Sequence, residues 1–128
     1  MLPATQVQLA TVFQHLKSIL SKYSPPLEAR TDLPSRYELY SNREVTVAGR
    51  KRKDMYFAGI IVQRGYVGFY LMPIYSHSEL KAKVPERLRK LLKGKSCFHI
   101  SEADPSVMRQ VATLTKKGFE LYQNFGWI

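Results

Sequence analysis

The sequence predicts an α+β fold, in which an antiparallel sheet of about five strands has N- and C-terminal helices packed on one face. Three observations lead to this prediction. Both ends of the chain show helical periodicity, residues 55–72 read as two β-rich segments around a tight turn, and short connections between strands favour antiparallel pairing. With 128 residues, the chain is expected to form a single domain spanning residues 1–128.

Residues 5–23 are predicted to form the first helix, which ends at Pro25 and Pro26 because neither proline can continue it. Its apolar residues recur at spacings of three and four and form one buried stripe: Leu9, Val12, Phe13, Leu16, Ile19, Leu20 and Tyr23. Residues 27–34 are expected to be a loop. Residues 36–40 and 44–48 alternate like two strands around a turn at residues 41–42, and the basic segment 49–54 is expected to be a loop.

Residues 55–72 form the centre of the predicted sheet. A two-residue turn at Arg64 and Gly65 pairs Val62 with Val67 and Gly59 with Tyr70. Side chains alternate across a strand, so one face is expected to meet the helices; it carries Ala58, Ile60, Val62, Val67, Phe69 and Leu71.

The opposite face of this hairpin combines aromatic side chains with two glycines. Tyrosine suits a half-exposed surface because its ring is apolar and its hydroxyl is polar. We therefore predict a partner- or ligand-binding face there, extended by the next strand along the chain. Its candidate binding residues are Phe57, Ile61, Tyr66, Tyr70, Met72, Cys97 and His99.

The second half of the chain predicts a helical crossover, a strand and a long helix. Pro73 ends the fourth strand, residues 78–80 form a helical turn, and residues 84–92 form a helix that Gly94 closes. Residues 96–100 alternate as a fifth strand. The last helix is expected to start with Asp104 as its N-cap and to run to about Asn124. Gly118 should allow close approach to a strand, and the apolar tail 125–128 should pack against the body.

Positive charge is the unusual global property, with a net charge of +10 at pH 7. Such an excess favours nucleic acid or another acidic partner. It is concentrated in two segments, and the simpler interpretation of each is a solvated surface. The candidate basic residues are Arg50, Lys51, Arg52, Lys53, Lys81, Lys83, Arg87, Arg89, Lys90, Lys93 and Lys95.

Few residues indicate catalysis or metal binding. Cys97 is the only cysteine, and Cys97 and His99 lie about 6–7 Å apart along a strand, too far for a direct hydrogen bond in a regular strand. A closed zinc site needs two further ligands. An enzyme is therefore the least supported class, and no cofactor or metal is expected. Residues 1–6 lack the pattern of a signal peptide and no apolar run could cross a bilayer, so we expect a cytoplasmic protein that does not bind membranes.

Four segments of the chain resemble the YdhG-like family of small bacterial domains, mostly of unknown function. They are residues 56–58, residues 67–70, residues 88–98 and the final helix. The resemblance implies a frataxin-like α/β sandwich. One member is described as an iron chaperone, but frataxins gather acidic residues along their first helix and residues 5–23 here contain none. No iron-binding residue is therefore transferred.

Three hypotheses about function follow. The first is a binding domain that uses the tyrosine-rich face for a partner, an apolar ligand or a second copy as a homodimer. The second is binding of nucleic acid or another acidic partner through the two basic segments. The third is iron or zinc handling through Cys97 and His99, with His77 as a third ligand.

Overall fold

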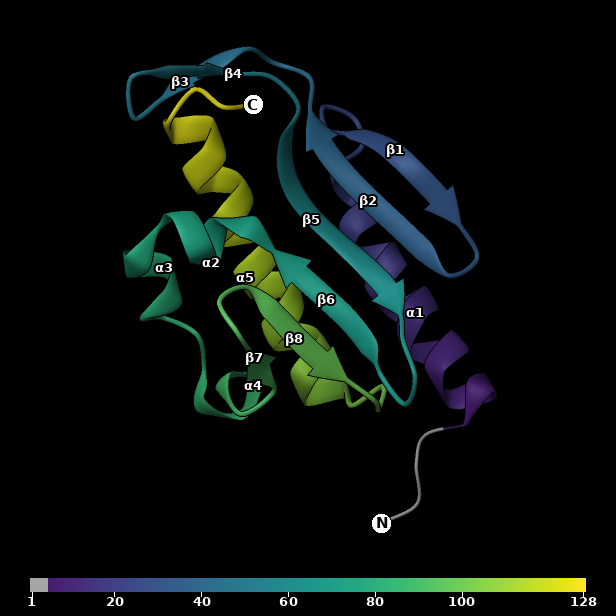
Figure 1. Cartoon of the computed structure of the whole chain (residues 1–128). Helices are drawn as coiled ribbons and strands as arrows, with labels where there is room; N and C mark the ends of the chain where they lie inside the picture. Colours follow the sequence, from purple (N-terminus) through teal and green to yellow (C-terminus); the bar gives the residue numbers. More distant parts are fainter. Residues whose placement is uncertain (1–4) are drawn as a thin grey trace.

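The computed structural model describes residues 5–128 and has two layers, with helices on one face of an antiparallel sheet (Figure 1). The sheet order is β1-β2-β5-β6-β8-β7. Its six strands, one more than the predicted number, are β1 (Glu28–Leu33), β2 (Arg36–Ser41), β5 (Met55–Val62), β6 (Val67–Leu71), β7 (Leu92–Lys93) and β8 (Cys97–Ile100). The predicted α+β class is confirmed. Residues 1–4, where we expected no signal peptide, lie outside the described residues.

The two long helices are those that the sequence predicts. α1 (Gln6–Leu20) starts with a capping box, in which the Gln8 backbone N–H donates to Thr5 Oγ1 at 3.1 Å. α5 (Pro105–Asn124) has Asp104 as its N-cap, accepting from the Ser106 backbone N–H at 2.8 Å. Both helices cover one face of the sheet and leave the other face free of helices (Figure 1). A short 3₁₀ helix, η1 (Ser21–Tyr23), follows α1.

The register of the central hairpin is also confirmed. Val62 pairs with Val67 and Gly59 pairs with Tyr70, and the Gln63 backbone N–H donates to the Tyr66 carbonyl at 2.8 Å. Gly65 has a φ of +85°, a left-handed conformation that glycine adopts without steric cost. The predicted core side chains Ala58, Ile60, Val67, Phe69 and Leu71 are all 0% exposed.

Three predictions for residues 27–54 are wrong. Residues 28–33 form β1 rather than a loop, and β1 pairs with β2 at the edge of the sheet. Residues 36–40 and 44–48 do not pair with each other, because β2 pairs with β1 and β5. Instead β3 (Val45–Val47) and β4 (Arg50–Arg52) form a separate hairpin, so the basic segment is partly a strand.

The crossover between β6 and β8 is more broken than predicted. It contains α2 (Met72–Ser76), α3 (Ser78–Lys81) and α4 (Glu86–Arg89), of which α4 is shorter than the expected helix over residues 84–92. Gly118 permits a close approach, as expected, but to α2 rather than to a strand. A Cβ at Gly118 would lie 3.0 Å from Cβ of Pro73.

The C-terminal tail packs against the body as predicted, except that Phe125 is 56% exposed. Trp127 is 8% exposed and lies in an aromatic cluster with Tyr122 and the buried His77. Ser41 Oγ donates to the Trp127 carbonyl at 2.6 Å, which ties the tail to the end of β2. Across residues 5–128, no helix combines the length and apolar character needed to cross a bilayer.

Candidate functional site

The open face of the sheet, opposite α1 and α5, gathers most of the predicted binding residues. Paired residues of neighbouring strands point to the same side of a sheet. One row across the face therefore contains Glu38, Gly59, Tyr70, Cys97 and Lys93. The next row contains Arg36, Ile61, Gly68 and His99.

Two tyrosine rings lie over the two glycines of this face. A Cβ at Gly59 would lie only 2.0 Å from the Tyr56 hydroxyl oxygen, and one at Gly68 would lie 3.1 Å from Cε1 of Tyr70. Both contacts are closer than ordinary van der Waals separation, so each glycine provides the space in which a ring rests on the backbone. Aromatic rings therefore cover the backbone of the open face at Gly59 and Gly68.

Cys97 and His99 share this face, as predicted, but each is engaged with a different tyrosine. The ring of His99 stacks on Tyr66 with centroids 3.8 Å apart and planes 12° apart. Burial lowers the pKa of His99, with a further contribution from the charge of Lys93. Burial raises the pKa of the Cys97 thiol, although its hydrogen bond with Tyr70 acts in the opposite direction. Because its pKa is raised, the thiol is not an activated nucleophile at neutral pH.

Residues 5–128 contain no group of three His, Cys, Asp or Glu side chains arranged to hold a metal ion. His77, the third ligand of the metal hypothesis, is instead buried against Phe125 and Trp127. Its Nδ1 lies 2.8 Å from Ser76 Oγ. The structure therefore does not bring His77 to Cys97 and His99.

A polar cluster interrupts the aromatic face on β2 and β5. Arg36 Nε donates to Glu38 Oε1 at 2.8 Å, and Glu38 is only 7% exposed. Burial raises the pKa of Tyr56, and the charge and hydrogen bond of Glu38 raise it further. Tyr40 packs edge-on against Tyr56 with centroids 5.1 Å apart. These residues are not among the predicted binding residues, although the alternation of Arg36, Glu38 and Tyr40 in a predicted strand places them on one face.

The prediction that Phe57 belongs to the open face is wrong. Phe57 is fully buried on the helix side, with its ring centroid 5.4 Å from that of Tyr122 and 6.1 Å from that of Phe119. The cause is a bulge: Leu39 pairs with Ala58, but Tyr40 pairs with Tyr56, so Phe57 is skipped and turns to the other side.

Met72 is not in a strand, because β6 ends at Leu71 and Met72 begins α2. It contributes instead to a groove of about 310 Å³ where the open face meets the β3–β4 hairpin. The lining is mostly apolar, but Arg52 and Lys53 of the hairpin add two cations. The full lining is Val47, Arg52, Lys53, Asp54, Met55, Tyr56, Met72, Tyr75, Ser76 and Trp127.

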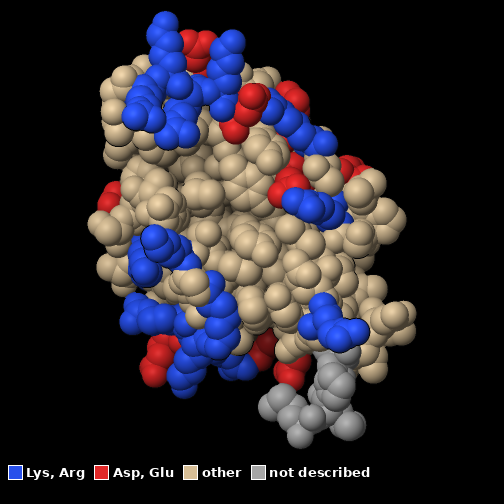
Figure 2. Space-filling model, viewed as in Figure 1, with Lys and Arg blue, Asp and Glu red and all other residues tan. Residues whose placement is uncertain are grey.

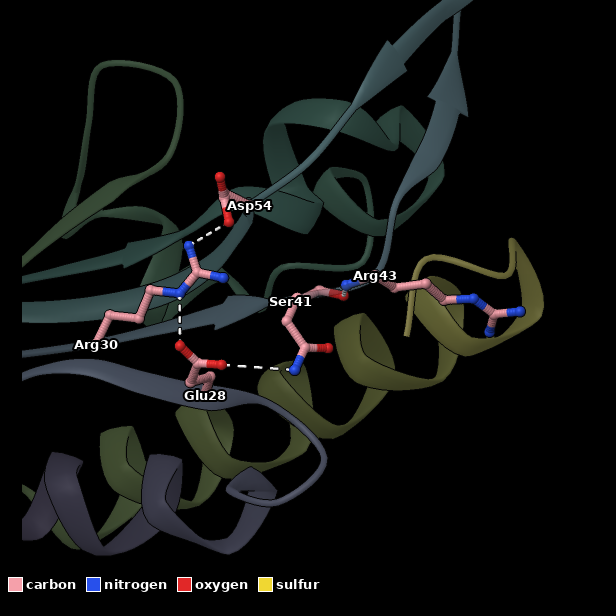
Figure 3. Close-up of polar contacts among 6 residues, drawn as sticks. Glu28, Arg30, Ser41, Arg43 and Asp54 are labelled. Carbon is pink, nitrogen blue, oxygen red and sulfur yellow. Dashed lines mark hydrogen bonds and ion pairs between the residues drawn. The ribbon is translucent and has the colours of Figure 1, made fainter.

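The base of the β3–β4 hairpin is fixed by ion pairs (Figure 3). Arg30 on β1 donates through Nε to Glu28 Oε1 at 2.9 Å and through Nη1 to Asp54, the residue before β5. Glu28 also accepts from Asn42 Nδ2 at 3.5 Å. These contacts link the edge strand to the segments that lead into and out of the hairpin.

The two predicted basic segments lie at opposite ends of the open face. We call residues 50–53 the hairpin cluster and the seven basic candidates between residues 81 and 95 the crossover cluster; all of these side chains are exposed. In Figure 2, Lys and Arg gather at the top and lower left of this face, with largely uncharged surface between them. The structure therefore brings aromatic rings and positive charge onto one surface.

Comparisons of this chain with protein-family models, curated proteins and solved structures give no match.

Proposed function

We propose that this chain is a binding domain that holds single-stranded nucleic acid on the open face of its sheet. The observation that carries this proposal is the placement of the aromatic face between the hairpin cluster and the crossover cluster (Figure 2). Proteins that bind single strands combine cations along the backbone path with aromatic rings on which bases stack. Tyr66, Tyr70 and Tyr40 are each partly exposed and supply such rings.

The charge of this surface argues for an acidic occupant rather than a second copy. A two-fold dimer through the open face, with its axis along or across the line between the two clusters, would bring basic clusters of the two copies together. Like charges in an interface oppose association. A polyanion, by contrast, gains from both clusters and releases its counterions on binding.

We also propose that the chain has the frataxin-like arrangement and belongs to the YdhG-like family. The layer order and the antiparallel sheet support the first part, and the four segments named above support the second. Iron handling has less support, because no acid lies in residues 5–23 and the net charge is +10. A cytoplasmic location is part of the same proposal.

The test is fluorescence anisotropy with a labelled oligothymidylate of about 15 nucleotides and the corresponding duplex. We expect preference for the single strand and an affinity that falls steeply as salt rises from about 50 to about 200 mM. Tyr66→Ala should weaken single-strand binding by roughly tenfold, because stacking of one base on an aromatic ring contributes about 1–3 kcal/mol. Equal affinity for the duplex, or no effect of Tyr66→Ala, would contradict the proposed stacking surface.

A matched pair of variants separates the effect of the basic clusters on affinity from the effect of net charge. Arg50→Glu with Lys51→Glu reverses two charges of the hairpin cluster, whereas Lys22→Glu with Lys116→Glu makes the same net change at exposed positions outside both clusters. The first double variant should lose far more affinity than the second. Light scattering on the same samples measures the oligomeric state. A salt-resistant dimer that Tyr70→Glu dissociates would mean that the open face serves self-association, which would contradict the proposal.

A further inference from the structure

A second groove lies away from the open face, between the segment that joins α3 to α4 and the helix α5. Its volume is about 220 Å³. Arg109, Thr113 and Lys117 are spaced by four residues and therefore share one stripe of α5. The full lining is Lys83, Pro85, Ser106, Arg109, Gln110, Thr113, Leu114 and Lys117.

Three cations converge on this groove without acidic partners. Within residues 5–128, none of the ion pairs involves Lys83, Arg109 or Lys117. The hydroxyls of Ser106 and Thr113 line the same space. Beyond the two lysines the groove continues past Glu79 and Glu120, so an anion is expected at the Arg109 end.

Gln110 supplies an independent indication of a ligand. Its Oε1 is the one buried side-chain nitrogen or oxygen atom in residues 5–128 that has no hydrogen-bond partner. Buried polar atoms almost always have a partner, because leaving one unpaired is costly. A turn of the Gln110 amide that brings Oε1 to face the groove would let a ligand hydroxyl donate the missing hydrogen bond.

We propose that this groove binds a small phosphate monoester that carries a hydroxyl group. Lys83, Arg109 and Lys117 contact the phosphate, for which the fork of the arginine guanidinium is well matched. A monoester carries a charge of about −1.5 to −2 near neutral pH, which three cations balance better than they balance the single charge of a diester. Gln110 accepts from the hydroxyl. Lys83 is the one lining residue that also belongs to the crossover cluster; the other lining residues belong neither to the open face nor to either basic cluster.

The test is a ¹H–¹⁵N NMR titration of the full chain with glycerol 3-phosphate, inorganic phosphate and glycerol at constant ionic strength. Glycerol 3-phosphate should bind at least fivefold more tightly than phosphate and should shift the Gln110 side-chain amide. Gln110→Ala should remove that preference while phosphate binding persists. Equal affinities for glycerol 3-phosphate and phosphate would mean an adventitious ion only, and would overturn the proposal.

Neighbouring lysines on α5 provide the control. Lys117→Glu should weaken glycerol 3-phosphate binding by at least tenfold, whereas Lys116→Glu, an equal charge change outside the lining, should weaken it by less than threefold. Similar losses in the two variants would show that the titration senses net charge alone, which would also overturn the proposal. Both side chains are exposed, and circular dichroism verifies that each variant is folded.

Discussion

Gly59 is the residue on which the shape of the open face depends most directly. Its missing Cβ leaves room for the hydroxyl of Tyr56, which would otherwise lie 2.0 Å away, and for Cγ of Glu38 at 2.9 Å. We expect Gly59→Ala to lower the free energy of unfolding by about 1–3 kcal/mol, the usual range for overpacking. Gly68→Ala should cost less, because its closest contact is the Tyr70 ring at 3.1 Å. Urea unfolding of both variants measures the difference.

The mechanism of the Gly59 effect can be checked in the same experiment. Tyr56→Phe removes the oxygen atom that the new methyl group would meet. Gly59→Ala should therefore be less destabilising in the Tyr56→Phe background than in the wild type, as a double-mutant cycle would show. If the effects of the two substitutions on the free energy of unfolding were simply additive, Tyr56 would move away without cost and another contact would cause the destabilisation by Gly59→Ala.

Tyr56 and Tyr122 also determine how stability depends on alkaline pH. Burial raises the pKa of both phenols in the folded state, above the ordinary value of 10.0. As pH rises through 10 the unfolded chain loses protons that the folded chain retains, so stability falls by up to about 1.4 kcal/mol per pH unit for each tyrosine. Tyr56→Phe should make this decline shallower, and Tyr75→Phe, at a 56% exposed tyrosine, should not. Urea unfolding between about pH 8 and pH 11 tests this, and equal slopes in all three proteins would contradict it.

At the scale of elements, the predictions that succeeded are those with a strong local signal. The turn at Arg64 and Gly65 determines the register of β5 and β6, and the Asp104-Pro105 pair determines where α5 begins. β1 was missed because an exposed edge strand with one packed face and many charges lacks apolar alternation. The pairing of β3 with β4 was missed because the Ala48–Gly49 turn lies within what reads as a solvated basic loop.

The candidate site was predicted in part for the same reason. Alternation placed Tyr66, Tyr70, Cys97 and His99 on one face, and the structure shows them there. Phe57 was misplaced because a bulge depends on the partner strand, which periodicity within a single strand does not show. The groove on α5 was missed because it needs Lys83 from a distant segment, although the spacing of Arg109, Thr113 and Lys117 is visible in the sequence.

At the scale of the whole molecule, positive charge is largely uncompensated. Only six of the 20 Lys and Arg side chains take part in ion pairs among residues 5–128. The pairs that do form are mainly at the surface, and surface ion pairs contribute little to stability. Mutual repulsion among the remaining cations therefore opposes the compact state.

This balance predicts that salt acts in opposite directions on folding and on binding. Raising NaCl from about 20 to about 200 mM shortens the screening length from about 20 Å to about 7 Å. Repulsion within the net charge of +10 is thereby weakened, so the midpoint of thermal unfolding should rise, while affinity for an oligonucleotide should fall. Differential scanning calorimetry measures the first effect. A midpoint that fell with salt would mean that the ion pairs around Arg30 and Arg36 stabilise the fold more than the repulsion destabilises it. Charge reversal in the hairpin cluster should raise the midpoint at low salt, because it removes repulsion at the same positions at which it removes binding.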